Sequence, residues 1–179
     1  QASNYRFCTI EPNVGLVDVP DKRLDKLAEL VIPDRTVPTQ IEIVDIAGLV
    51  RGASKGEGLG NKFLANIREV DAIIHVVRCF EDDNILRDEG PINPVSDKEI
   101  IETELQLKDL ESVEKKMQRT EKMAKTDPKM KVELETLIQC KKHLEEGKNI
   151  ISLGLSKEEK SAIDDLFLLT DKHILYVAN

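Results

Sequence analysis

The chain has 179 residues, of which 40% are hydrophobic, 34% charged and 3% aromatic, and its formal net charge is −8. This length suits one sizeable core or a core plus a small insert. The negative charge and scarce aromatics argue against general nucleic-acid affinity, so no direct DNA binding is expected. No apolar run reaches the roughly 20 residues of a membrane-spanning helix, and we expect neither a signal peptide nor a membrane partner.

The first half of the chain alternates short strands with helices. Apolar and polar residues alternate in the first two predicted strands. The run around His75 is apolar on both faces, as in the middle of a parallel sheet. The stretch from Gly48 to Gly60 holds five glycines and predicts a loop. The expected elements are strand 15–19, a helix capped by Asp21, strand 40–46, helix 61–70 and strand 71–79.

Two long helices follow a charged loop over residues 82–94. Ser96 and Glu99 form an S-x-x-E pattern, which predicts a capping box at the first helix. Residues 126–128 break the helical pattern, and the second helix ends near Gly147. Both helices carry narrow apolar stripes, so we expect an antiparallel, coiled-coil-like hairpin. The stripes are Ile101, Leu105, Leu110, Val113 and Met117, and then Met130, Leu134, Leu137, Ile138 and Leu144.

The remaining residues return to an α/β pattern. Ser156 and Glu159 predict a second capping box, opening a short helix to about Leu168, and residues 173–178 read as the last strand. The whole order of elements predicts an α/β fold with a mostly parallel sheet and an inserted helical hairpin. We divide the chain into residues 1–94, the inserted hairpin at 95–148, and a return to the first domain at 149–179.

Polar or reactive residues lie at the carboxyl ends of three predicted strands. They are Asp45, Cys79 and Asn179. In open parallel sheets, ligands bind beyond the carboxyl ends of the strands. The sequence therefore predicts a ligand site at this edge of the sheet.

Asp45 and Gly48 form a D-x-x-G pattern at the end of a strand. A carboxylate there can hold Mg²⁺, and a glycine lets its backbone N–H approach a terminal phosphate closely. The same four residues also fit an ordinary turn after a strand. The glycines beyond favour a loop that changes shape, as a phosphate sensor must, although a flexible linker is the alternative. These loop glycines are Gly52, Gly56, Gly58 and Gly60.

Thr9 is a further candidate, because a threonine hydroxyl before the first strand could ligate Mg²⁺; an ordinary loop threonine is the alternative. His75 lies inside an apolar strand and is interpreted as a core residue rather than a base. The cysteines Cys8, Cys79 and Cys140 match no metal-site spacing. They predict packing roles and a reduced, cytoplasmic setting.

Three segments carry a resemblance that spans essentially the whole chain. They are NYRFCTIEPN at residues 4–13, DIAGLVRGASKGEGLGNKFL at 45–64 and HVVRCF at 75–80. These segments strongly resemble the YchF / Obg-like ATPase family, in the Obg branch of P-loop translational GTPases. The resemblance implies an incomplete Ras-like P-loop NTPase fold with an OBG-type G domain, interrupted by the helical hairpin.

The resemblance also assigns roles to single residues. It implies that Thr9 is the switch I threonine, binding nucleotide and Mg²⁺, and that Asp45 and Gly48 are the switch II pair. Leu49 stands where many GTPases place a catalytic glutamine, so no catalytic side chain is assigned. Asn179 resembles the first residue of the family's N-x-x-E motif, which accompanies a preference for ATP over GTP.

The activity implied is Mg²⁺-dependent hydrolysis of ATP, and less well of GTP, by a cytoplasmic, ribosome-associated switch. The alternative is a non-catalytic fragment that docks a partner through the hairpin. The sequence has no G-x-x-x-x-G-K-[ST] loop, which the family places before Asn4 on a central strand, and no TGS module. We therefore expect these 179 residues alone to be inactive, to bind nucleotide weakly, and to be unstable or to associate through unpaired strands.

Overall fold

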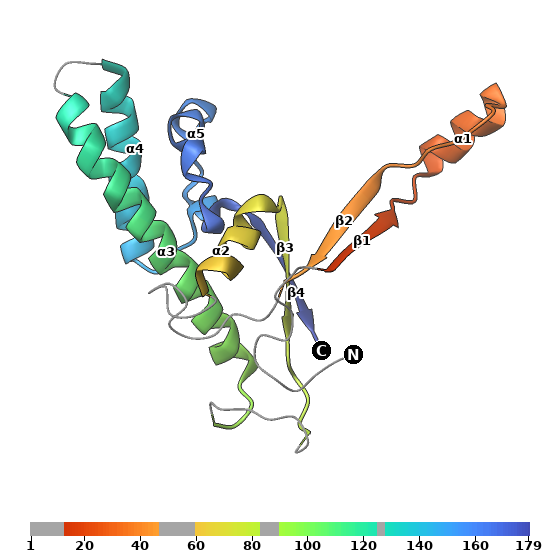
Figure 1. The fold of residues 1–179 in the computed structure, drawn as a ribbon, viewed down its shortest axis with the longest axis horizontal. Coiled ribbons are helices and arrows are strands. Elements are labelled where there is room, and N and C mark those ends of the chain that lie inside the picture. Colours follow the sequence, from red (N-terminus) through yellow and green to blue (C-terminus); the bar gives the residue numbers. More distant parts are fainter. Residues whose placement is uncertain (1–12, 47–59, 83–89, 125–127) are drawn as a thin grey trace. The chain divides into compact units, whose positions relative to one another are not determined.

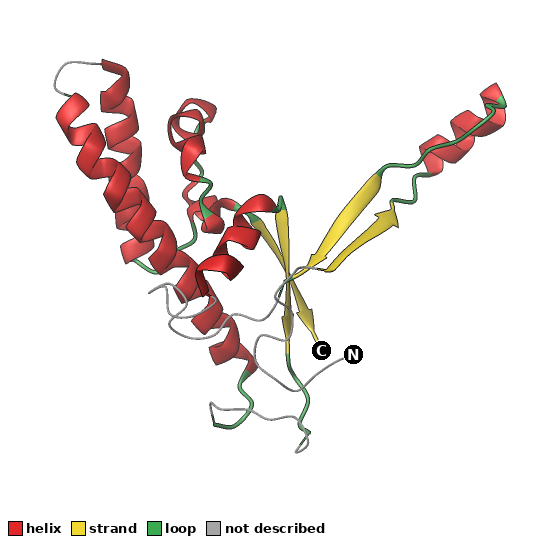
Figure 2. Cartoon of the chain, in the orientation of Figure 1, coloured by secondary structure: helices red, strands yellow, loops and turns green. Residues whose placement is uncertain are grey.

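The computed structural model describes residues 13–46, 60–82, 90–124 and 128–179 (Figures 1 and 2). Two units can be distinguished: Tyr5–Ala47 forms one, and the other consists of Gln1–Asn4 with Gly48–Asn179. Each is described separately below. No helix in the described ranges is both long and apolar enough to cross a membrane.

The smaller unit is a β-hairpin with a helix between its strands. Strand β1 (Asn13–Asp18) pairs antiparallel with β2 (Gln40–Asp45), and Asn13 lies opposite Asp45. Helix α1 (Lys22–Val31) begins as predicted, because the Asp21 carboxylate accepts a hydrogen bond from the Arg23 N–H at 2.9 Å. No side chain of residues 13–46 is buried, so this unit holds no core of its own in the described part of the chain.

The larger unit contains the parallel pair of strands. Helix α2 (Gly60–Glu69) leads to β3 (Ala72–Val77), which pairs in parallel register with β4 (His173–Ala178). The bounds of β4 agree with the predicted strand 173–178. Parallel pairing is thus confirmed for β3 and β4. Strands β1 and β2 pair antiparallel, so the prediction of a mostly parallel sheet is wrong for the described strands.

One face of the β3–β4 pair is apolar and open in the described structure. Side chains on alternate residues point to the same face of a strand, and four of them lie 39–63% exposed. The sequence predicted a strand buried on both faces. The exposed set is Ile74, Val76, Leu175 and Val177.

The helical hairpin supplies most of the core. Helices α3 (Pro94–Met123) and α4 (Pro128–Glu145) run side by side in opposite directions (Figure 1). The chain then passes through η2 (Ile150–Leu153), α5 (Lys157–Ile163), η3 (Asp164–Leu166) and η4 (Leu169–Asp171). One cluster of buried side chains joins these elements. It consists of Val113, Leu137, Cys140, Leu144, Ile150, Ile163 and Leu168.

The predicted cap of α3 is wrong. Asn93, not Ser96, is the N-cap: its side chain accepts a hydrogen bond from the Ser96 N–H at 3.1 Å. Asparagine is a strong N-cap residue, and Pro94 suits the first helical turn, where its missing N–H costs nothing. Together they start the helix earlier than the S-x-x-E pattern predicts.

Two further details differ from the sequence prediction. Ile138 is 52% exposed, because the buried face of α4 follows Leu137, Cys140 and Leu144. The capping box of Ser156 and Glu159 is confirmed, but α5 ends at Ile163 rather than near Leu168. Two consecutive aspartates follow Ile163, and negative charge at a helix C-terminus opposes the helix dipole.

Candidate functional site

The predicted site residues fall partly within the described structure. Thr9, Gly48, Gly52, Gly56 and Gly58 lie outside the described residues. Those that can be placed are Asp45, Gly60, Cys79 and Asn179.

Asp45 is the last residue of β2, and its side chain is exposed. The strand presents its carboxylate at the end nearest in sequence to the glycine-rich segment. Within the described ranges no three His, Cys, Asp or Glu side chains gather as a metal site would require. Of the two predicted Mg²⁺ ligands, Asp45 is described by the structure and Thr9 lies outside the described residues.

Gly60 is not a loop residue, as the sequence predicted, but the first residue of α2. The first residues of a helix leave their N–H groups without intrahelical partners, and glycine is well tolerated at such a position. The predicted glycine loop therefore runs directly into the N-terminus of α2. That helix end is where backbone N–H groups favour an anion.

The structure brings Cys79 and Asn179 together. The Cys79 N–H donates to the Asn179 carbonyl at 2.6 Å, and the Asn179 N–H donates to the Val77 carbonyl at 2.9 Å. The parallel ladder therefore continues past the ends of β3 and β4. This confirms that two of the three predicted strand-end residues share one edge of a sheet.

Arg78 organises the turn that follows β3, a role the sequence analysis missed. Its Nε donates to the Phe80 carbonyl at 3.0 Å, and its Nη2 donates to the Asp82 carbonyl at 3.1 Å. The guanidinium also lies 4.9 Å from the centre of the Phe80 ring. The chain beside Cys79 and Asn179 is thus folded around one arginine.

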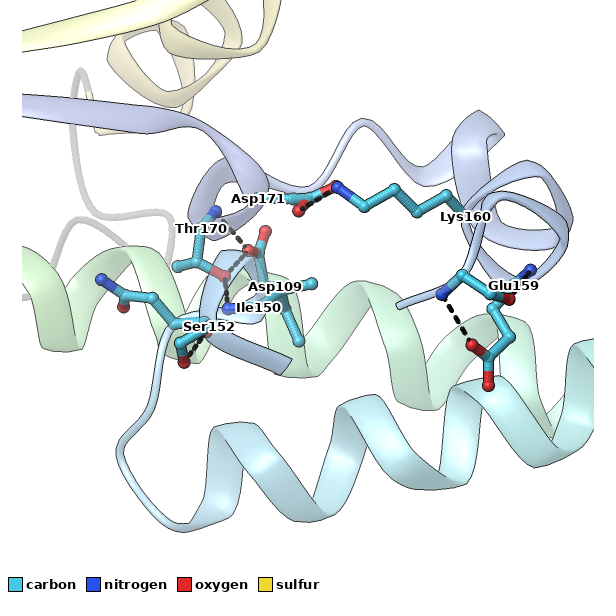
Figure 3. A network of polar contacts seen from close by, with 9 residues as sticks. Asp109, Ile150, Ser152, Glu159, Lys160, Thr170 and Asp171 are labelled. Atoms are coloured by element: carbon cyan, nitrogen blue, oxygen red, sulfur yellow. Dashed lines mark hydrogen bonds and ion pairs between the residues drawn. The ribbon is translucent and has the colours of Figure 1, made fainter. Parts of the chain in front are cut away.

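A buried carboxylate holds the segment that leads into β4 (Figure 3). Asp109 of α3 is fully buried and accepts hydrogen bonds from the Leu169 N–H at 2.8 Å, the Thr170 N–H at 2.7 Å and the Thr170 hydroxyl at 2.7 Å. The Ile150 N–H donates in turn to that hydroxyl at 3.3 Å. Burial raises the pKa of Asp109, and these three donors partly offset the rise.

A sequence signal for Asp109 existed. It stands four residues after Leu105 and four before Val113, inside the apolar stripe of α3. A charged residue on a buried helix face needs partners there. The position of Asp109 in the stripe therefore indicated a buried carboxylate. Nothing in the sequence identified Thr170 as the partner of Asp109.

A second polar group lies where α3 covers β3 and β4. The Tyr176 hydroxyl donates to Glu102, whose carboxylate also pairs with Lys98 at 2.7 Å. Burial and the bond to Glu102 raise the pKa of Tyr176. His75 is half-buried with its ring 5.6 Å from that of Tyr176, and burial lowers its pKa. This environment agrees with a packing role for His75.

Cys140 also has the packing role predicted for it. Its side chain is fully buried, and burial raises the pKa of the thiol to about 12. A thiol that stays protonated is a poor nucleophile. The packing role predicted for Cys79 is wrong, because its side chain is exposed at the strand edge, and Cys8 lies outside the described residues.

Comparison with known proteins gives one family and a consistent set of relatives. The sequence model of the 50S ribosome-binding GTPase family matches residues 1–125. The "Ribosome-binding ATPase YchF" of Escherichia coli O157:H7 is 56% identical over 180 aligned positions, covering 100% of this chain and 50% of the relative. The protein of that name from Bacillus subtilis is 54% identical, covering 100% of this chain and 49% of the relative.

A solved structure gives the same picture. The Schizosaccharomyces pombe YchF GTPase superposes with a TM-score of 0.75 at 40% identity, covering 99% of this chain and 49% of that one. The similarity supports a P-loop NTPase-like α/β fold. The chain spans about half the length of the relatives that it matches.

Proposed function

This chain belongs to the 50S ribosome-binding GTPase family and is homologous to the YchF ATPases, and we propose that it forms part of a Mg²⁺-dependent nucleotide switch that hydrolyses ATP on the ribosome. The observation that carries the proposal is the shared edge of β3 and β4. There the backbone of Asn179 is paired with Cys79, at the position where parallel α/β sheets bind ligands. The family relationship selects a nucleotide as the ligand.

Asp45 and Thr9 are the proposed ligands of the metal ion. Magnesium prefers oxygen donors and keeps several waters, so one or two protein ligands are enough. The exposed carboxylate of Asp45 at a strand end fits that requirement, since no ion pair to it occurs among the described residues. When bound, the ion would neutralise charge developing on the phosphates.

Gly48 is the proposed contact to the terminal phosphate, through its backbone N–H. The loop glycines Gly52, Gly56, Gly58 and Gly60 would let the intervening chain close on that phosphate and open without it. Because Gly60 begins α2, such a movement would reach the helix directly. Leu49 offers no proton-transfer group, so water would be positioned by other groups.

Asn179 is the proposed contact to the nucleobase. Its amide can both donate and accept hydrogen bonds, as base recognition requires. We infer a preference for ATP over GTP, a cytoplasmic location, and the ribosome or a ribosomal subunit as partner. The proposed division is a nucleotide domain at residues 1–94 and 149–179, with the hairpin inserted at 95–148.

The hairpin-docking alternative receives less support. The central stripe residues Val113, Leu137 and Leu144 are at most 5% exposed. These three side chains therefore serve as the hairpin's own packing seam, and of the stripe only Ile138 is exposed among the described residues.

Nucleotide binding tests the proposal. In the gene product at its natural length, we expect fluorescent ATP and GTP analogues to bind with Mg²⁺, ATP more tightly. Asn179→Ala is expected to weaken ATP binding about tenfold, which corresponds to one or two lost hydrogen bonds. Cys79→Ser, on the same edge, is the matched control and should bind within about twofold of the unchanged protein. Absence of Mg²⁺-dependent binding of either nucleotide would refute the proposal.

A further inference from the structure

The C-terminus of α2 is held by one lysine far away in sequence. Lys172 Nζ donates to the Ile67 carbonyl at 2.9 Å, to the Arg68 carbonyl at 2.6 Å and to the Val70 carbonyl. The last carbonyls of a helix have no intrahelical partner, and positive charge there complements the helix dipole. An ammonium has three donors, and here all three bond to the same helix end.

Lys172 is itself fixed to the helical hairpin. It follows Asp171 at the end of η4, the segment whose Leu169 and Thr170 are bound by the buried carboxylate of Asp109. Only one residue separates Thr170 from Lys172. A displacement of the end of α2 therefore acts on a segment that is bonded to the middle of α3.

A second contact joins the same two helices directly. Arg68 of α2 donates from Nη2 to the Ser112 hydroxyl of α3 at 3.2 Å, and Ser112 lies one turn after Lys108, whose carbonyl accepts from that hydroxyl at 3.1 Å. Arg68 Nε is buried, and it is without a hydrogen-bond partner in the described part of the chain. A buried donor left unbonded is costly. The Arg68–Ser112 bond is thus a second link between α2 and α3, beside the one through Lys172.

We propose that Lys172 is a positioning residue that couples α2 to the α3–α4 hairpin, so that the nucleotide state at one end of α2 changes the hairpin through the other. The proposal rests on the proposed function, because it takes the segment before α2 as the phosphate sensor. The three-carbonyl clamp and the Asp109–Thr170 bonds form the connection, and they lie within one unit of the structure.

Hydrogen–deuterium exchange on the natural-length protein tests the coupling. Exchange of peptides from Pro94–Met123 is compared with Mg²⁺ and either ADP or a non-hydrolysable ATP analogue. For the unchanged protein we expect at least about a threefold difference in exchange rate between the two states. Lys172→Met should abolish that difference while the KM for ATP stays within about threefold, and Lys172→Arg should restore part of it.

The matched control is Lys160→Met. Lys160 pairs with Asp171 at 3.2 Å, in the same segment, and among the described residues its Nζ makes no hydrogen bond or ion pair to α2. This variant should keep the full nucleotide-dependent difference, which a general loosening of the segment would remove. If Lys172→Met fails to fold, Thr170→Val decides, because it removes the hydroxyl bond to Asp109 and should reduce the difference at least by half.

The possible failures can be told apart. Absence of nucleotide binding would refute the proposed function. Nucleotide binding without any change in α3 exchange would overturn the coupling and leave the function intact. A difference that persists at full size in Lys172→Met would show that Lys172 does not carry it. Where that variant does not fold, a difference at full size in Thr170→Val would overturn the connection through Asp109.

Discussion

At the residue scale, Asp109 is the polar side chain on which the junction of α3 and η4 depends. Its two carboxylate oxygens accept from three donors, two of them backbone N–H groups. Hydrogen bonds to a charged group are stronger than neutral ones. Its burial is therefore tolerated because its oxygens are bonded.

Replacing Asp109 by Ala should destabilise the fold by about 3 kcal/mol, because it leaves buried donors without an acceptor. Urea denaturation followed by circular dichroism measures this free energy of unfolding. Asp165→Ala is the control: Asp165 pairs with Lys116 but its side chain is 69% exposed, so the loss should stay under about 1 kcal/mol. Equal losses in the two variants would contradict the role given to Asp109.

His75 should make stability depend on pH. Burial lowers its pKa in the folded state, Glu102 opposes that effect, and Lys98 adds to it. In the unfolded chain, His75 takes up a proton below about pH 6.5. In the folded chain, the same imidazole binds that proton more weakly. The stabilising contribution is thus present above that pH and is lost as the pH falls. Compared with His75→Phe, the unchanged protein should lose unfolding free energy between pH 7.5 and 5.5; parallel pH profiles would contradict this.

At the element scale, local sequence rules predicted most boundaries. Alternating residues located β2, and the Asp21 and Ser156 caps located α1 and α5, because these signals act within a few residues. The partner of each strand was not predictable in this way. Pairing of β1 with β2 depends on contacts between distant segments, which no local pattern encodes.

The same limit applied to the candidate site. Asp45 was predicted because it ends a strand and begins a D-x-x-G pattern, and Asn179 because it directly follows the last strand and resembles the start of the family's N-x-x-E motif. Lys172 was missed, because its three partners are carbonyls about a hundred residues earlier and carbonyls leave no trace in sequence. Its side chain is partly buried, and that burial lowers its pKa.

The start of α3 offers a test of the corrected cap. Asn93→Ala should cost about 1 kcal/mol of stability, because it removes the acceptor for the Ser96 N–H. Ser96→Ala should change stability by less than about 0.5 kcal/mol. Thermal unfolding of the two variants distinguishes the caps. A larger loss for Ser96→Ala would restore the S-x-x-E capping box.

At the scale of the whole molecule, both units expose apolar surface in the described residues. Residues 13–46 contain no buried side chain, and Ile74, Val76 and Leu175 on one sheet face are 55–63% exposed. Isolated proteins seldom leave such faces open. These exposed apolar surfaces are where the 179 residues would associate with other molecules. That they are unstable or associate on their own stays a prediction.

ATP turnover tests the central claim, that Asp45 holds the metal ion of a nucleotide switch. Asp18 provides a matched control, because it is an exposed aspartate at the opposite end of the same two-stranded sheet. In the natural-length protein with Mg²⁺, Asp45→Asn should lower kcat for ATP by roughly 100-fold, while Asp18→Asn stays within about twofold. Turnover in Asp45→Asn equal to that of the unchanged protein would contradict the claim.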